Sequence, residues 1–187
     1  VLVDTEPFYH RRRIDYLRGV GVVVERPPDL TGSNEKAIWE AFVPDADRRR
    51  EELKMGYRDY QESHPAPFGE LLDPQVTPLF HELKRLGFRL AIASSSDMDC
   101  IREVMAVAGI ADVVDYFISG EECAAHTPNP EVYLRALAGL GIAAEEAVAV
   151  EDSPTGIAAA KNAGLTVYAL CAGPAEKARD LSRAYGC

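Results

Sequence analysis

The sequence predicts an α/β fold, a doubly wound parallel sheet with a small all-helical domain inserted after the first strand. Three observations support this prediction. Short apolar runs alternate with helical patterns of about ten residues along residues 75–187, as in βαβ units. Two of these runs end abruptly in polar residues, which is typical of strands that reach the binding edge of a parallel sheet. Residues 10–74 contain no apolar run of the buried-strand kind.

The expected elements of the α/β part follow from the spacing of apolar residues and from glycines that end helices. Strands are expected at Arg89–Ser95, Asp115–Ser119, Ala147–Val150 and Thr166–Cys171. Apolar residues at helical spacing predict a helix before the first strand and one in each connection between strands. The residues that mark these helices are Leu79, Leu83 and Leu86, then Ile101, Met105 and Ala108, then Tyr133, Leu137 and Leu140, and last the segment Thr155–Ala163.

Residues 10–74 are expected to form a helical cap domain, and residues 1–9 and 75–187 the α/β core. Helical patterns appear at Glu35–Phe42, which includes Trp39, and in a longer stretch around Tyr57. Turn-forming residues separate these patterns, with two prolines at 27–28 and a proline-containing run at 64–69. Two arginine clusters, at 11–13 and 48–50, are interpreted as solvated helix faces.

The most informative stretch is the acidic pair Glu151 and Asp152, directly behind the apolar run Ala147–Val150. Adjacent side chains on a strand point to opposite faces, but at the end of a strand the backbone turns and both acids can approach one cation. Carboxylate oxygens suit Mg²⁺, which takes one or two of them and completes its shell with water and substrate phosphate. The alternative is that the acids only cap the helix that begins near Pro154. Because a cap needs a single acid, the pair favours a metal site.

A second strand end carries three hydroxyl side chains, Ser94, Ser95 and Ser96, before Asp97 opens a helix. Backbone N–H groups and hydroxyls at such a position can bind an anion. The alternative is an ordinary Ser or Asp helix cap, which requires only one such residue. Together with the acidic strand end, the serines predict a site for a phosphate group beside a metal ion.

Composition limits the classes of partner. A formal net charge of -10 argues against nucleic acid, whose phosphate backbone requires clustered Lys and Arg, and against an anionic membrane surface. No segment has the length and apolar character of a membrane span. The four cysteines have no metal-binding spacing, so they are expected to be reduced and the location cytoplasmic. We expect a monomer or weak dimer that acts on a small phosphorylated metabolite.

Four segments in order also carry a resemblance to a known family. They read VLVDTEP at 1–7, LAIASSS at 90–96, TPNPEVY at 127–133 and VEDSPTGI at 150–157. Together they resemble the haloacid dehalogenase-like hydrolases, in the β-phosphoglucomutase-like and phosphatase branch with a helical cap. The resemblance covers nearly the whole chain. It implies a Rossmann-like core, Mg²⁺ dependence and an aspartyl-phosphate intermediate.

The chain departs from the family pattern at two points. In the family an Asp-x-Asp motif precedes the segment that matches Val1–Pro7; its first Asp is the nucleophile and its second the general acid/base. The resemblance therefore implies that both aspartates and the central first strand lie upstream of Val1, and that residues 1–187 by themselves are inactive. The family also carries a Lys that steadies the phosphate, and the matching residue here is Thr127.

These considerations predict a Mg²⁺-dependent phosphatase of small phosphate monoesters. Asp152 and Glu151 are the expected metal residues, and Ser94 and Thr127 the expected catalytic positions. Ser95, Ser96, Tyr9 and Asn34 are the expected substrate-binding residues. One alternative is a sugar-phosphate mutase, which the resemblance disfavours because Asn34 stands where the mutases have a phosphate-binding Arg. The other is a catalytically silent binding or regulatory relative, which Thr127 favours.

Overall fold

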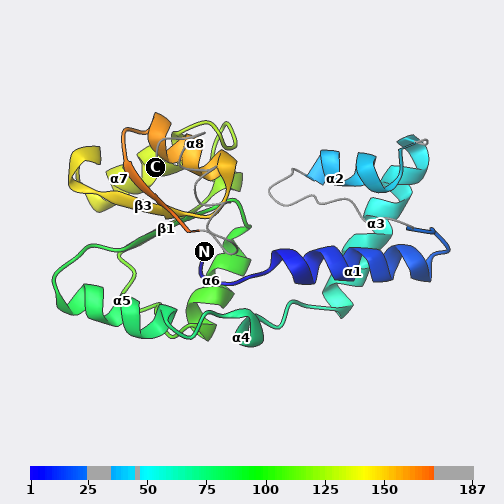
Figure 1. Cartoon of the computed structure of the whole chain (residues 1–187), viewed down its shortest axis with the longest axis horizontal. Helices are drawn as coiled ribbons and strands as arrows, with labels where there is room; N and C mark the ends of the chain where they lie inside the picture. The colour runs from blue at the N-terminus through cyan, green and yellow to red at the C-terminus, as the bar shows by residue number, and fades with distance from the viewer. Residues whose placement is uncertain (25–34, 45–46, 171–187) are drawn as a thin grey trace. The chain divides into compact units, whose positions relative to one another are not determined.

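The computed structural model describes residues 1–24, 35–44 and 47–170. The chain divides into two compact units (Figure 1). One comprises Val1–Val3 and the chain from Leu72 onward, and the other comprises Asp4–Leu71. The assignment of residues 10–74 as a cap stays a prediction. No helix among the described residues combines the length and apolar character needed to cross a membrane.

The first unit alternates helices and short strands along the chain. Its α-helices are α5 (Val76–Arg85), α6 (Met98–Val107), α7 (Glu131–Leu140) and α8 (Pro154–Asn162). Its strands are β1 (Ala91–Ser94), β2 (Tyr116–Ser119), β3 (Val148–Glu151) and β4 (Thr166–Ala169), with short 3₁₀ turns at Gly120–Glu122 and Ala144–Glu146. Each predicted strand is present. β1, β2 and β4 are shorter than expected, β3 is displaced by one residue so that it ends at Glu151, and Cys171 lies outside the described residues.

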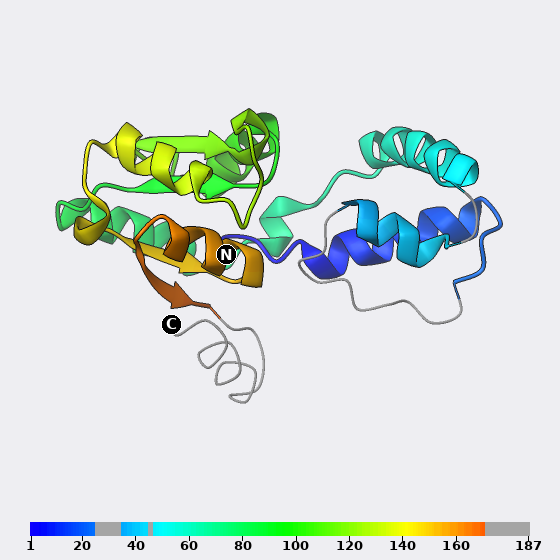
Figure 2. The same ribbon diagram turned by 90° about the horizontal axis from the view of Figure 1, so that it is seen from above.

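Both ladders between the named strands are parallel, as predicted, and an isolated antiparallel bridge joins Val3 to Leu72. Ala91 of β1 pairs with Tyr116 of β2, and Val148 of β3 pairs with Thr166 of β4. Within the described ranges no ladder joins β1 to β3, so the strands form two pairs rather than one continuous sheet. Figure 2 shows the green β1–β2 pair and the orange β3–β4 pair as distinct ribbons.

Helices cover the β1–β2 pair on both faces, which is the doubly wound arrangement. Neighbouring strand residues point in opposite directions, since Ile118 joins a cluster with α7 and α8 whereas Phe117 packs against a cluster from α5 and α6. The α7–α8 cluster also contains Ala149 of β3 and Val167 of β4. One hydrophobic core therefore spans both strand pairs.

Helices are the only regular secondary structure among the described residues of the second unit. It contains α1 (Glu6–Gly19), α2 (Glu35–Phe42), α3 (Asp47–Ser63) and the short α4 (Phe68–Leu71). Aromatic and aliphatic residues from α1, α2 and α3 form its core, in which Leu17 and Trp39 are almost fully buried.

The prediction that residues 11–13 form a solvated helix face is wrong for Arg12. Its side chain is buried, and its guanidinium lies 4.9 Å from the centre of the Tyr9 ring. Its Nε donates to the Tyr57 hydroxyl at 3.2 Å and one terminal nitrogen donates to the His64 carbonyl at 2.8 Å. Because that carbonyl follows the C-terminal end of α3, the guanidinium meets the negative end of the helix dipole.

Candidate active site

The acidic strand end is built by the junction of β3 and α8. Glu151 is the last residue of β3, and Ser153 is the N-cap of α8, with its hydroxyl accepting from Gly156 N at 3.0 Å. Pro154 occupies the first turn of α8, where a missing N–H costs nothing. The cap is thus made by the serine, which leaves both acids free of the capping role considered above.

The Glu151 carboxylate is hydrogen-bonded at both oxygens. Its Oε2 accepts from Asp152 N at 3.1 Å, from Ser153 N at 3.3 Å and from Ser153 Oγ at 3.2 Å. Its Oε1 accepts from the hydroxyl of Tyr133, a buried residue of α7. Burial, reinforced by the charge of Glu151, raises the pKa of Tyr133, so the phenol keeps its proton and remains a donor at neutral pH.

Gly156 leaves room for this carboxylate. A methyl group at Gly156 would lie 2.3 Å from the carboxyl carbon of Glu151, far inside van der Waals contact. The glycine of the EDSPTG segment is therefore required by a close approach between the first turn of α8 and the side chain of Glu151.

Asp152 has a different environment. Its side chain is 48% exposed, and its Oδ2 lies 2.6 Å from the backbone nitrogen of Val1. Among the described residues this nitrogen is the one group that hydrogen-bonds to the Asp152 carboxylate. Asp152 can therefore still accept further bonds at its carboxylate, whereas both oxygens of Glu151 already accept hydrogen bonds from nearby groups.

The donor set fits Mg²⁺ in type and number. Within the described ranges no group of three or more His, Cys, Asp or Glu side chains converges. Mg²⁺ needs only one or two carboxylates because it keeps several waters and binds substrate phosphate. Asp152 offers such a carboxylate, and Glu151 lies beside it in the chain.

The serine strand end lies at the end of β1. Ser94 Oγ accepts from Ser96 N at 3.2 Å, and the Ser96 carbonyl accepts from the buried Ser119 hydroxyl at 2.7 Å. Ser95 and Ser96 are exposed. Asp97 caps α6 by accepting from Cys100 N at 2.8 Å. Since Asp97 provides the cap, the three serines are not needed for it.

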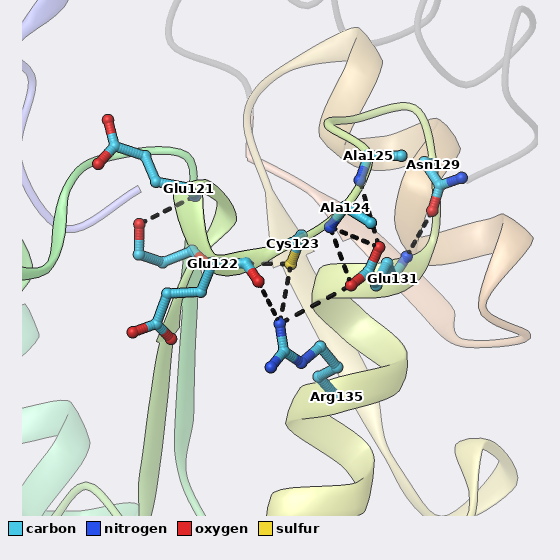
Figure 3. Close-up of polar contacts among 9 residues, drawn as sticks. Glu121, Glu122, Cys123, Ala124, Ala125, Asn129, Glu131 and Arg135 are labelled. Carbon is cyan, nitrogen blue, oxygen red and sulfur yellow. Dashed lines mark hydrogen bonds and ion pairs between the residues drawn. The ribbon is translucent and has the colours of Figure 1, made fainter.

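Thr127 lies in the loop between β2 and α7, and the first turns of α7 hold that loop (Figure 3). The Glu131 carboxylate accepts from Ala124 N at 2.9 Å and from Ala125 N at 3.2 Å. Arg135 donates to the Glu122 carbonyl at 2.5 Å, and its guanidinium also contacts Glu131 (Figure 3). The Thr127 hydroxyl has no hydrogen-bond partner in the part of the chain that the structure describes, so it remains available to a ligand.

The structure does not test the two remaining predicted residues. Tyr9 lies on α1 in the helical unit, with the Arg12 guanidinium over its ring. Asn34 lies outside the described residues. The roles of both residues in substrate binding stay predictions.

Sequence reasoning missed Tyr133, Ser153, Gly156, Glu131 and Arg135. Tyr133 was expected only as part of the apolar face of α7, and it does pack in the core, but its hydroxyl reaches Glu151. A usable signal was present in Pro130-Glu131, where an acid in the first turn of a helix predicts contact with nearby N–H groups.

Comparison with known proteins identifies the family of this chain. The model of the haloacid dehalogenase-like hydrolase family matches residues 27–170. CbbY of Rhodobacter capsulatus is 38% identical over 97 residues, which are 50% of this chain and 43% of CbbY. Hexitol phosphatase B of Escherichia coli K12 is 28% identical over 174 residues, covering 87% of this chain and 76% of that protein.

A solved structure from Thermotoga maritima, assigned as a β-phosphoglucomutase, superposes with a TM-score of 0.73 and 25% identity. The match covers 95% of this chain and 86% of the other. The chain therefore belongs to the haloacid dehalogenase-like hydrolase family, in its β-phosphoglucomutase-like branch. Both the predicted family and the predicted α/β fold are confirmed.

The close approach at Gly156 generates a stability prediction. Replacing a helical glycine by alanine ordinarily stabilises a helix by about 0.5–1 kcal/mol. Gly156→Ala should instead lower the free energy of unfolding by about 1–3 kcal/mol, because the new methyl group must displace the Glu151 carboxylate. Chemical denaturation measures the difference.

Gly19→Ala is the matched control, since no atom lies within 4 Å of the position that its methyl group would take at the end of α1. This control should be neutral or stabilising. A Gly156→Ala protein as stable as the wild type would show that Glu151 is not tightly held.

Proposed function

We propose that this protein is a Mg²⁺-dependent phosphatase of small phosphorylated sugars. The observation that carries the proposal is the difference between the two acids at the end of β3. Both oxygens of Glu151 accept hydrogen bonds from nearby groups, whereas Asp152 is 48% exposed and, among the described residues, accepts a hydrogen bond from Val1 N alone. The names of two similar proteins, a hexitol phosphatase and a β-phosphoglucomutase, support a sugar phosphate as the substrate class.

In this proposal Asp152 ligates Mg²⁺ directly and Glu151 supports the site. When bound, the ion would neutralise charge on the phosphoryl oxygens as the phosphorus–oxygen bond breaks. Ser94 Oγ and the backbone N–H of Ser95 would donate hydrogen bonds to the same oxygens. Thr127 would add a hydroxyl donor but no positive charge.

The covalent step requires an Asp that we place upstream of Val1. Its carboxylate oxygen would attack phosphorus and displace the sugar oxygen, which takes a proton from a second upstream Asp. That second Asp, now ionised, would accept a proton from water as the water hydrolyses the aspartyl-phosphate. The resemblance to the family, in which an Asp-x-Asp motif precedes the segment that matches Val1–Pro7, supports this placement.

Two other functions stay open. A sugar-phosphate mutase would share the metal site, and it is disfavoured only by Asn34. A silent relative that binds a phosphorylated ligand without turnover is favoured by Thr127. The predicted cytoplasmic location rests on the spacing of the four cysteines, and the monomeric or weakly dimeric state stays a prediction.

The metal assignment predicts unequal effects of the two acids. Asp152→Ala should abolish Mg²⁺ binding measured by titration calorimetry, because it removes the direct ligand. Glu151→Gln should weaken binding by about 10–100-fold, as expected for a residue that orients a ligand. Asp112→Ala is the control, since Asp112 is an exposed acid of the same unit. The Mg²⁺ affinity of this variant should equal that of the wild type. Equal affinities in the wild type and Asp152→Ala would contradict the proposed site.

Because Thr127 stands where the family has a Lys, restoring the positive charge at this position should increase phosphatase activity. Thr127→Lys in the natural protein should raise the rate of hydrolysis of a generic phosphomonoester by about 10–1,000-fold, equivalent to about 1.4–4 kcal/mol in the barrier. Thr166→Lys adds the same charge at an exposed position of β4 and should leave the rate unchanged. An unchanged or lower rate in Thr127→Lys would favour the binding protein over the phosphatase.

A further inference from the structure

Tyr133 is the link between helix α7 and the acidic strand end. Its side chain is 8% exposed, and its ring packs in the core formed by α7, α8 and the strands. Its hydroxyl donates to Glu151 Oε1, a bond between residues 18 positions apart in the sequence. A buried donor and a carboxylate in this arrangement satisfy each other, since each would otherwise lose a hydrogen bond on leaving water.

The helix that carries Tyr133 is itself fixed at its N-terminal end. Asn129 Oδ1 accepts from Glu131 N at 3.0 Å, and the Glu131 carboxylate accepts from two backbone N–H groups of the preceding loop. Asn162 of α8 donates to the Pro128 carbonyl at 3.1 Å, which ties that loop to α8. The helix that carries the Tyr133 phenol is therefore held in place at this end by hydrogen bonds to the preceding loop and, through that loop, to α8.

The bond to Tyr133 determines how the rest of Glu151 is used. With Oε1 held on one side and Gly156 closely packed on the other, Oε2 is directed to the backbone N–H groups of Asp152 and Ser153. These bonds fix the peptide that follows Glu151. The orientation of that peptide sets the direction in which the Asp152 side chain points. The Asp152 side chain is the exposed one of the two acids.

We propose that Tyr133 is a positioning residue of the acidic strand end: its hydroxyl holds Glu151, and through Glu151 it sets the orientation of Asp152 toward a divalent cation. The inference rests on the proposed metal site and adds a residue of α7 to it. In this inference Tyr133 acts through Glu151, the residue to which its hydroxyl donates.

The test compares Tyr133→Phe with Tyr116→Phe. Both substitutions remove one hydroxyl from a tyrosine in the α/β unit, but in the described part of the chain the Tyr116 hydroxyl makes no hydrogen bond. Tyr133→Phe should raise the Mg²⁺ dissociation constant by about 10–100-fold, whereas Tyr116→Phe should leave it unchanged. In the metal-free protein, Tyr133→Phe should also speed hydrogen exchange at the Asp152 and Ser153 amides by about tenfold, because their acceptor is no longer held.

Unchanged hydrogen exchange at these two amides in Tyr133→Phe would overturn the proposal. Faster exchange with unaltered Mg²⁺ affinity would also overturn it, because the hydroxyl would then have a structural role alone. A wild-type protein that binds no Mg²⁺ would refute the proposed metal site and the metal-directed half of this inference. The exchange measurement would then still show whether Tyr133 positions the strand end.

Discussion

A carboxylate that leaves water must recover its hydrogen bonds from the protein, and Glu151 recovers them from two helices and its own turn. Tyr133 of α7 supplies one donor, and Ser153 at the start of α8 supplies two. Gly156 supplies space instead of a bond. One acid at the end of β3 therefore contacts both α7 and α8, while the packing of these helices against the strands comes from their shared hydrophobic core. The same interactions leave the neighbouring Asp152 exposed and free to bind.

Helix α7 contacts both the acidic strand end and the loop between β2 and α7. Its first residue, Glu131, and its fifth, Arg135, hold the loop that carries Thr127, and Tyr133 between them reaches β3. These contacts come from a helix whose other face packs in the core, so the geometry of the site is linked to the stability of the α/β unit. Three side chains of α7 are therefore enough to hold both the loop that carries Thr127 and the carboxylate of Glu151.

The fold class, the order of strands and helices, and the acidic pair could be predicted from the sequence because each depends on local pattern. Gly156 was visible within its motif, but its role was not, since a close approach to Glu151 exists only after folding. The partner of Tyr133 lies 18 residues away, and no periodicity reveals that pairing. Arg12 was misjudged because its neighbours in sequence are charged, whereas its neighbours in space are Tyr9 and Tyr57.

The central claim is that the end of β3 binds a divalent cation through Asp152. Manganese shares the preference of Mg²⁺ for carboxylate oxygen, and its paramagnetism broadens the nuclear magnetic resonance signals of nearby residues. A titration of the uniformly ¹⁵N-labelled protein with Mn²⁺ is the most direct measurement. The account predicts that the amide signals of Asp152 and Ser153 broaden first, and that excess Mg²⁺ restores them. Broadening that begins at the exposed acids Glu121 and Glu122 and spares Asp152 would contradict it.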